Sequence, residues 1–210
     1  MPTEHTAAYQ AVVSSQRTPQ YNTNLKHVLQ RPVKNGNNQK NQNIPIHFGD
    51  TVEGFSPKDK CLAAIKKVAS EFHKFNGPVY HMIGNHCLYN LPREQLLPLL
   101  NINSNNNNCA YYEFSPNPSY RFVILDGYDI SAIGWPKNHP KTTQARIFLD
   151  EKNPNLEKNS PEGLEGLERR FLKFNGAVGE EQLKWLDCVL LDASKLKQKV
   201  IVCCHLPLHH

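Results

Sequence analysis

The stretch YHMIGNH, residues 80–86, decides the fold of this chain, because an apolar run ends there at metal-binding types of side chain. The same pattern occurs twice more, at FGD in residues 48–50 and at CHLP in residues 204–207. Short apolar runs that end at turn residues are typical of buried strands in parallel sheets. Open α/β sheets bind ligands where such strands end. We therefore predict an α/β fold with a binding site at this edge.

Four side chains stand at these strand ends: Asp50, Asn85, His86 and His205. The glycines that precede Asp50 and Asn85 allow the backbone to turn sharply, so that the next side chain points into the crevice. Each residue alone is more often an ordinary polar group at a strand end. Acid, amide and imidazole together, from three separate segments, indicate a metal site.

The spacing of these segments predicts one strand–helix–strand crossover. Residues 44–48 and 79–83 should be its strands, although Pro45 fits poorly in a central one. The helix should begin with Ser56 as N-cap and Pro57 in its first turn. Further along the chain we predict hairpin strands over 110–114 and 120–125, helices near 142–149, 164–174 and 180–196, a loop over 153–163 and a last strand over 199–204.

The composition predicts one domain of intracellular type. The 210 residues are 39% hydrophobic with negative mean hydropathy, and we expect a flexible leader over 1–24 followed by a single domain over 25–210. The chain contains no apolar run long enough to span a membrane and shows no signal peptide, so we expect a cytoplasmic protein. The six cysteines should be reduced.

The net charge of +5 suits an anionic ligand. The basic residues form no dense block, so nucleic acid is not the expected partner. A small molecule that contains phosphate fits better, bound by a monomer.

Four longer stretches carry a resemblance to a known family: GDTVEGF at 49–55, GNHCLYN at 84–90, LDGYD at 125–129 and NSPEGL at 159–164. They resemble the manganese-dependent ADP-ribose/CDP-alcohol diphosphatases in their plant-like form, within the calcineurin-like metallophosphoesterase superfamily. The resemblance implies a partial α/β/β/α sandwich with mixed sheets and helices on the outer faces. It also implies hydrolysis of the diphosphate bond in ADP-ribose and in CDP-alcohols such as CDP-choline and CDP-glycerol, which gives AMP or CMP and a phosphorylated partner.

The resemblance further implies residue roles in a two-metal Mn²⁺ site. Asp50 would bridge the metals, while Asn85 and His205 would bind one of them through oxygen and nitrogen, donors that suit Mn²⁺. His86 would be the catalytic acid at the leaving phosphate oxygen. Asp126 is a weaker candidate for substrate binding, and a turn acid that caps the Gly127 turn is equally compatible with its position.

Two motifs of the family have no counterpart in this sequence. Asp50 is the first aspartate, so no Asp-x-His or Asp-x-Gln precedes it, and none of the eleven glycines is followed by His, so Gly-His-x-His is missing as well. We therefore expect a chain truncated at both ends, with little or no activity and with an exposed sheet edge. Two alternatives stay open: a non-catalytic module that binds a nucleotide or a protein, and a calcineurin-like phosphatase or phosphodiesterase.

Overall fold

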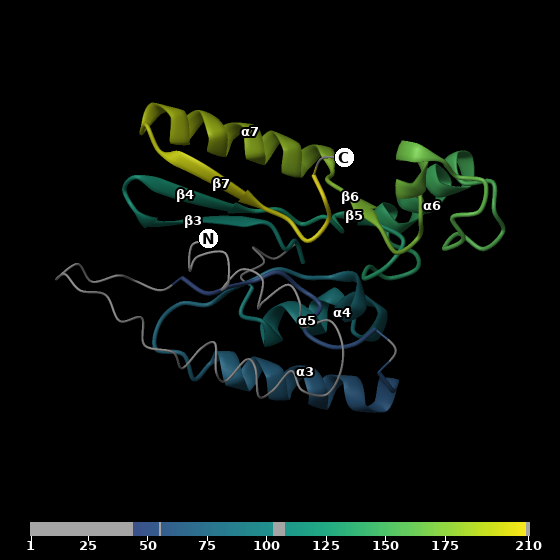
Figure 1. The fold of residues 1–210 in the computed structure, drawn as a ribbon, viewed down its shortest axis with the longest axis horizontal. Coiled ribbons are helices and arrows are strands. Elements are labelled where there is room, and N and C mark those ends of the chain that lie inside the picture. Colours follow the sequence, from purple (N-terminus) through teal and green to yellow (C-terminus); the bar gives the residue numbers. More distant parts are fainter. Residues whose placement is uncertain (1–43, 55, 103–107, 209–210) are drawn as a thin grey trace, which may run out of the picture.

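The computed structural model describes residues 44–54, 56–102 and 108–208 in four layers (Figure 1). The predicted leader over 1–24 lies outside these residues. Helices α3, α4 and α5 cover a two-stranded sheet, and α7 covers a three-stranded sheet on the opposite side. The elements of these layers are α3 (Lys58–Phe72), α4 (Asn85–Asn90), α5 (Arg93–Leu99), β1 (Ile46–His47), β2 (Tyr80–His81), β3 (Tyr112–Asn117), β4 (Tyr120–Ile124), β7 (Lys199–Cys203) and α7 (Glu180–Lys195).

A smaller unit lies at one end of these layers (Figure 1). It contains β5 (Ile130–Ser131) paired antiparallel with β6 (Gly176–Ala177), helix α6 (Pro140–Lys152) and the 3₁₀ helix η1 (Gly166–Arg170). No helix within the described ranges has the length and apolar character needed to cross a bilayer.

Three apolar clusters confirm the predicted α/β/β/α order. The first joins the helices to the small sheet and includes Ile65 of α3 and Ile83 after β2. The second, built on Met82, Ile124 and Cys203, fills the space between the two sheets. The third places Val123, Leu125 and Val189 between the larger sheet and α7. The β1–β2 sheet and the β3–β4–β7 sheet therefore each have an apolar cluster on both faces.

The predicted crossover is present. Strands β1 and β2 run parallel, with Ile46 opposite Tyr80 and His47 opposite His81, and α3 connects them. Both strands are shorter than predicted. Pro45 lacks an N–H and precedes β1, although its carbonyl still accepts a 3.0 Å hydrogen bond from the Tyr80 N–H.

Two helix predictions were wrong in detail. Helix α3 begins at Lys58 with Pro57 in the N-cap position, so Ser56 does not cap it. Residues 164–174 form only the short η1 helix, because Gly163 and Gly166 adopt φ values of 73° and 49°, which interrupt α-helical geometry.

The last strand also differs from the prediction. Strand β7 pairs parallel with β4 in the larger sheet, so the site residues come from two sheets and not from one. It is an edge strand of that sheet, with Ile201 and Val202 each 39% exposed, where a buried strand was expected. Residues 199–203 thus carry His205 to the junction between the two sheets.

Candidate metal centre

Two glycines allow three segments to meet at the ends of β1, β2 and β7. A Cβ atom at Gly49 would lie 2.7 Å from His205 Nδ1, and a Cβ atom at Gly84 would overlap the carboxylate of Asp50. Gly49 also has a φ of 98°, which favours glycine. Both positions therefore require a residue without a side chain for the segments to approach this closely.

Asp50 is held in a strained backbone conformation. Its φ of 52° lies in the left-handed region, which costs a residue other than glycine roughly 1–2 kcal/mol. Its Oδ1 accepts a 3.0 Å hydrogen bond from the His86 N–H, in the first turn of α4. Such strain persists where surrounding contacts enforce it, and it is frequent at ligand sites.

Nε2 of His205 faces two oxygens. Its Nδ1 lies 2.6 Å from the carbonyl oxygen of Phe48, which can only accept, so Nδ1 carries the proton and donates. In the neutral ring, Nε2 then has a lone pair, and it lies 3.2 Å from Asn85 Oδ1 and 3.6 Å from Asp50 Oδ2. The Asn85 amide donates through Nδ2 to the Tyr89 hydroxyl at 3.1 Å, which directs Oδ1 toward His205.

Three lone-pair atoms thus face one another, which is unfavourable unless a cation or a proton lies among them. This donor set of carboxylate, amide and imidazole fits Mn²⁺ and similar divalent ions. In the described part of the chain, no three His, Cys, Asp or Glu side chains gather as a metal site. The third ligand beside Asp50 and His205 would be the amide oxygen of Asn85.

The neighbouring cysteines do not add thiolate ligands. Burial raises the pKa of Cys87, and the Thr51 N–H donates to its sulfur at 3.2 Å. Burial also raises the pKa of Cys204, the residue before His205. Both side chains therefore stay as thiols at neutral pH, and the site offers oxygen and nitrogen only.

His86 lies at the open side of this cluster. Its Nδ1 is 3.8 Å from Asp50 Oδ2 and 3.9 Å from Glu53 Oε1, and its side chain is 32% exposed. The ring contacts Tyr89 with a centroid distance of 5.9 Å. A protonated His86 ring can therefore pair with either carboxylate and still reach a ligand from the solvent side.

Comparison with known proteins finds close relatives, although no family model matches. The chain is 62% identical over 190 residues to the manganese-dependent ADP-ribose/CDP-alcohol diphosphatase of Arabidopsis thaliana, covering 90% of this chain and 61% of that protein. The diphosphatase of the same name from Oryza sativa subsp. japonica is 57% identical, with 90% and 59% covered.

A solved structure agrees with these relatives. The crystal structure of a dimetal phosphatase from Danio rerio superposes with a TM-score of 0.70 at 37% identity, covering 78% of this chain and 55% of that chain. The chain is a homologue of the manganese-dependent ADP-ribose/CDP-alcohol diphosphatases. It spans about 60% of the length of the two plant relatives.

Within this diphosphatase homologue, the structure brings Asp50, Asn85, His86 and His205 together as the sequence predicts. Their roles toward metal and substrate stay predictions. Asp126 lies elsewhere, in the interior: its side chain is 0% exposed and forms two hydrogen bonds with Arg93, at 2.6 and 3.1 Å. A ligand would reach Asp126 only by displacing a protein donor.

Two residues of the homologue's site did not emerge from the sequence. Glu53 stands beside His86, and its position four residues after Gly49 in GDTVEGF was the available signal. The Phe48 carbonyl fixes the proton on His205, and a main-chain group leaves no sequence signal at all.

Proposed function

We propose that this chain binds Mn²⁺ through Asp50, Asn85 and His205 and acts on the diphosphate bond of ADP-ribose or CDP-alcohols. The proposal rests on three atoms with lone pairs that face one another where the two sheets meet: Asp50 Oδ2, Asn85 Oδ1 and His205 Nε2. The names of the plant relatives supply the substrate class. The chain spans about 60% of the length of these relatives, so their activity is a proposal for this chain.

The chain's own residues have separate tasks in this reaction. A bound divalent cation supplies charge neutralisation at the phosphoryl oxygens and lowers the pKa of a coordinated water. The Phe48 carbonyl keeps the proton on Nδ1 of His205 and so keeps Nε2 available as a ligand atom. His86 stands where it can hold a proton near Asp50 and Glu53 and donate it to the oxygen of the leaving phosphate.

Low turnover of this chain stays a prediction. Among the described residues the cluster offers one carboxylate, one amide and one imidazole, whereas divalent ions such as Mn²⁺ prefer about six ligand atoms each. Water must therefore complete the coordination of any bound ion. Fewer protein ligands weaken binding, and they leave the attacking water less strongly activated.

The test measures metal binding and turnover separately. We expect Mn²⁺ to bind, as followed by electron paramagnetic resonance, and His205→Ala to weaken that binding by at least about 10-fold, since changes even behind the ligands cost this much. His73→Ala is the control, because His73 lies at an exposed contact with Asn101. Hydrolysis of ADP-ribose and CDP-choline is followed by release of AMP and CMP. If Mn²⁺ binds equally to both variants, the proposed centre is wrong; binding without turnover favours the non-catalytic module.

A further inference from the structure

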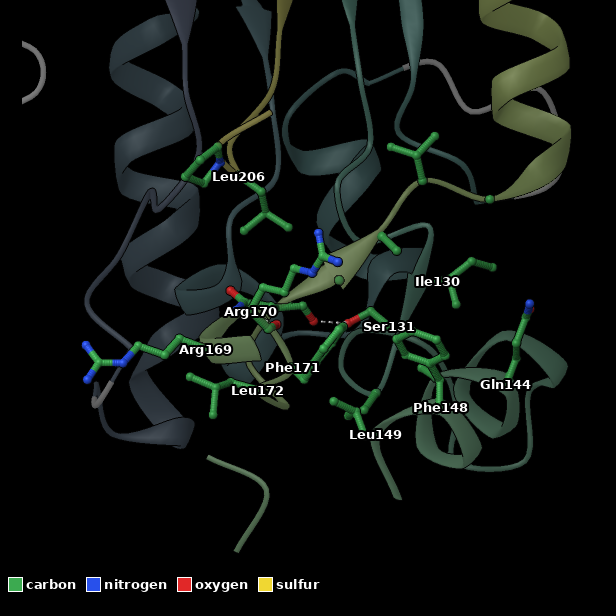
Figure 2. A pocket seen from close by; sticks show the side chains of 18 of the residues that line it. Ile130, Ser131, Gln144, Phe148, Leu149, Arg169, Arg170, Phe171, Leu172 and Leu206 are labelled. Carbon is green, nitrogen blue, oxygen red and sulfur yellow. Dashed lines mark hydrogen bonds between the residues drawn. The ribbon is translucent and has the colours of Figure 1, made fainter. Parts of the chain in front are cut away.

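A pocket lies next to the candidate metal centre, in the smaller unit of the fold. Its volume is about 760 Å³, and its walls come from the β5–β6 sheet, α6, η1 and residues 206–208 (Figure 2). This volume is within the usual range for small-molecule sites. None of the residues with a task in the proposed reaction lines this pocket.

The pocket and the candidate metal centre share neighbouring residues of the sequence. Leu206 and Pro207 form part of the pocket wall, and they follow His205 without an intervening residue. A Cβ atom at Gly127 would lie 3.1 Å from Leu206, so the main chain at the end of β4 backs this wall closely. The pocket wall therefore begins at the residue next to a candidate metal ligand, His205.

Arg170 places a positive charge in the pocket wall. Figure 2 shows its side chain directed toward Leu206, while that of Arg169 turns away. The Arg170 guanidinium lies 5.1 Å from the Phe171 ring, and Arg170 forms no ion pair with any described residue. Its main chain is held, because its carbonyl accepts a 3.0 Å hydrogen bond from Asn175 Nδ2. A guanidinium with free donors is suited to a phosphate.

Aromatic rings form the opposite part of the pocket. Phe148 and Phe171 meet edge to face with a centroid distance of 5.5 Å, and Phe148 is 47% exposed (Figure 2). Polar groups are few. The Ser131 hydroxyl already donates to the Asn175 carbonyl at 3.1 Å, and the side chains of Gln144 and Glu180 in the lining are exposed. Such walls favour a flat ring over a chain of hydroxyl groups.

We propose that this pocket binds the nucleoside half of the diphosphate substrate, with Arg170 at the phosphate that stays attached to it. The inference rests on the proposed function. The other half of the substrate fits less well. A choline group would be repelled by Arg170, and a ribose phosphate or glycerol phosphate would leave its hydroxyls against Phe148 and Phe171 without partners.

This assignment has a consequence for specificity. Apolar walls discriminate weakly between ligands of similar shape, and strong selection requires buried polar groups that pair with the base. Among its described side chains, Ser131 and Asn175 already donate within the protein, and the amide of Gln144 and the carboxylate of Glu180 are exposed and not buried. Adenine and cytosine nucleotides should therefore bind with similar affinity.

The experiment uses AMP, CMP and adenosine as probes of the chain without Mn²⁺, with dissociation constants measured by isothermal titration calorimetry. Arg170→Gln should weaken AMP binding by about 10-fold, as expected for loss of a charged hydrogen bond, and should leave adenosine binding within about 2-fold. Phe148→Ala should weaken AMP and adenosine alike. Arg146→Gln is the matched control, because it removes the same charge from an exposed arginine of α6 that does not line the pocket.

The outcomes separate this inference from the proposed function. Equal effects of Arg170→Gln and Arg146→Gln on AMP, unchanged adenosine binding in Phe148→Ala, or no AMP binding at all would each overturn the pocket assignment, even if the chain hydrolyses ADP-ribose. If instead AMP responds as expected and neither Mn²⁺ binding nor hydrolysis is found, the pocket stands and the proposed function fails. Thermal unfolding checks that the variants, all at exposed positions, are folded.

Discussion

Asp50 and Asp126 both stand beside a glycine just after a strand, yet their surroundings are opposite. The Asp126 carboxylate accepts from Arg93 twice and from the N–H groups of Ala110 and Tyr128, at 2.6 to 3.1 Å. The Asp50 carboxylate accepts a single described hydrogen bond, from the His86 N–H. Its other oxygen faces His205 Nε2 at 3.6 Å.

The difference shows how to separate a structural acid from a ligand-binding acid. Asp126 has its charge and its lone pairs matched by protein donors, in a site that excludes water, so it can be explained by stability alone. Asp50 is 16% exposed, strained and directed at an acceptor, which is unfavourable without a ligand. The number of protein donors around each carboxylate thus distinguishes the two where the sequence motif does not.

Removal of Arg93 should produce the largest effect on stability. Arg93→Ala leaves the Asp126 carboxylate buried and without its ion-pair partner, a change that costs about 3–5 kcal/mol of unfolding free energy. Urea unfolding measures this loss. Arg146→Ala, at an exposed arginine of α6, is the control and should change the free energy by less than about 0.5 kcal/mol. A loss below about 1 kcal/mol for Arg93→Ala would contradict the structural role of Asp126.

Lowering the pH should destabilise the β1–β2 layer, which carries Asp50, before the layer that carries Asp126. His47 and His81 are neighbours on β1 and β2, with ring centroids 5.4 Å apart, and both rings contact Phe72. These strands deliver Asp50 and Asn85 to the site. Protonation of either histidine would place a charge in an apolar cluster.

The direction of the pH effect follows from the two pKa values. Burial, followed by the charges of His81 and His205, lowers the pKa of His47 from 6.5 to about 3; burial and His73 lower the pKa of His81 to about 4. Below pH 6.5 the unfolded chain binds protons that the folded chain does not, so stability falls with pH until the folded values are reached. At pH 5 the loss is up to about 2 kcal/mol per histidine.

Hydrogen exchange locates this loss. Between pH 7 and pH 5, the protection of the Met82 N–H, which donates to the His47 carbonyl at 2.8 Å, should fall more than that of the Leu125 N–H, which donates to Cys203. Protection is calculated relative to the intrinsic exchange rate of each amide at the same pH, because that rate itself depends on pH. His81→Leu should reduce the pH dependence by about half, because one of the two titrating groups is gone. An unchanged pH dependence in this variant would exclude the histidine pair as the cause.

The sequence predicted the parts of the fold that depend on local chemistry. Glycines before Asp50 and Asn85 marked the strand ends, and the helix between them implied the parallel pairing of β1 with β2. The position of His205 in a second sheet was beyond prediction, since strand order depends on packing between distant segments. The same is true of Arg93, which meets Asp126 across 33 residues.

Helix α7 shows a further limit of sequence patterns. In the sequence, apolar side chains recur on one face of this helix, at Leu183, Leu186, Leu190, Ala193 and Leu196. Three of them, Leu183, Leu190 and Leu196, are 52%, 39% and 58% exposed. Ala193 of this face is buried, and Val189 beside the face packs against the larger sheet. Periodicity shows which residues share a face, but the neighbouring layer decides which face is covered.

Asp50→Asn should have the smallest effect on stability and the clearest effect on metal binding. Asparagine tolerates a φ of 52° and keeps an oxygen for the His86 N–H, while its amide nitrogen can donate to His205 Nε2. Without Mn²⁺ the unfolding free energy should therefore change by less than about 1 kcal/mol. With Mn²⁺ at 100 times its Kd, the parent chain should gain about 2.7 kcal/mol and the variant far less. Urea unfolding with and without Mn²⁺ measures both quantities. A large loss without Mn²⁺ would mean that Asp50, like Asp126, is held by the protein for stability, and the contrast between the two acids would disappear.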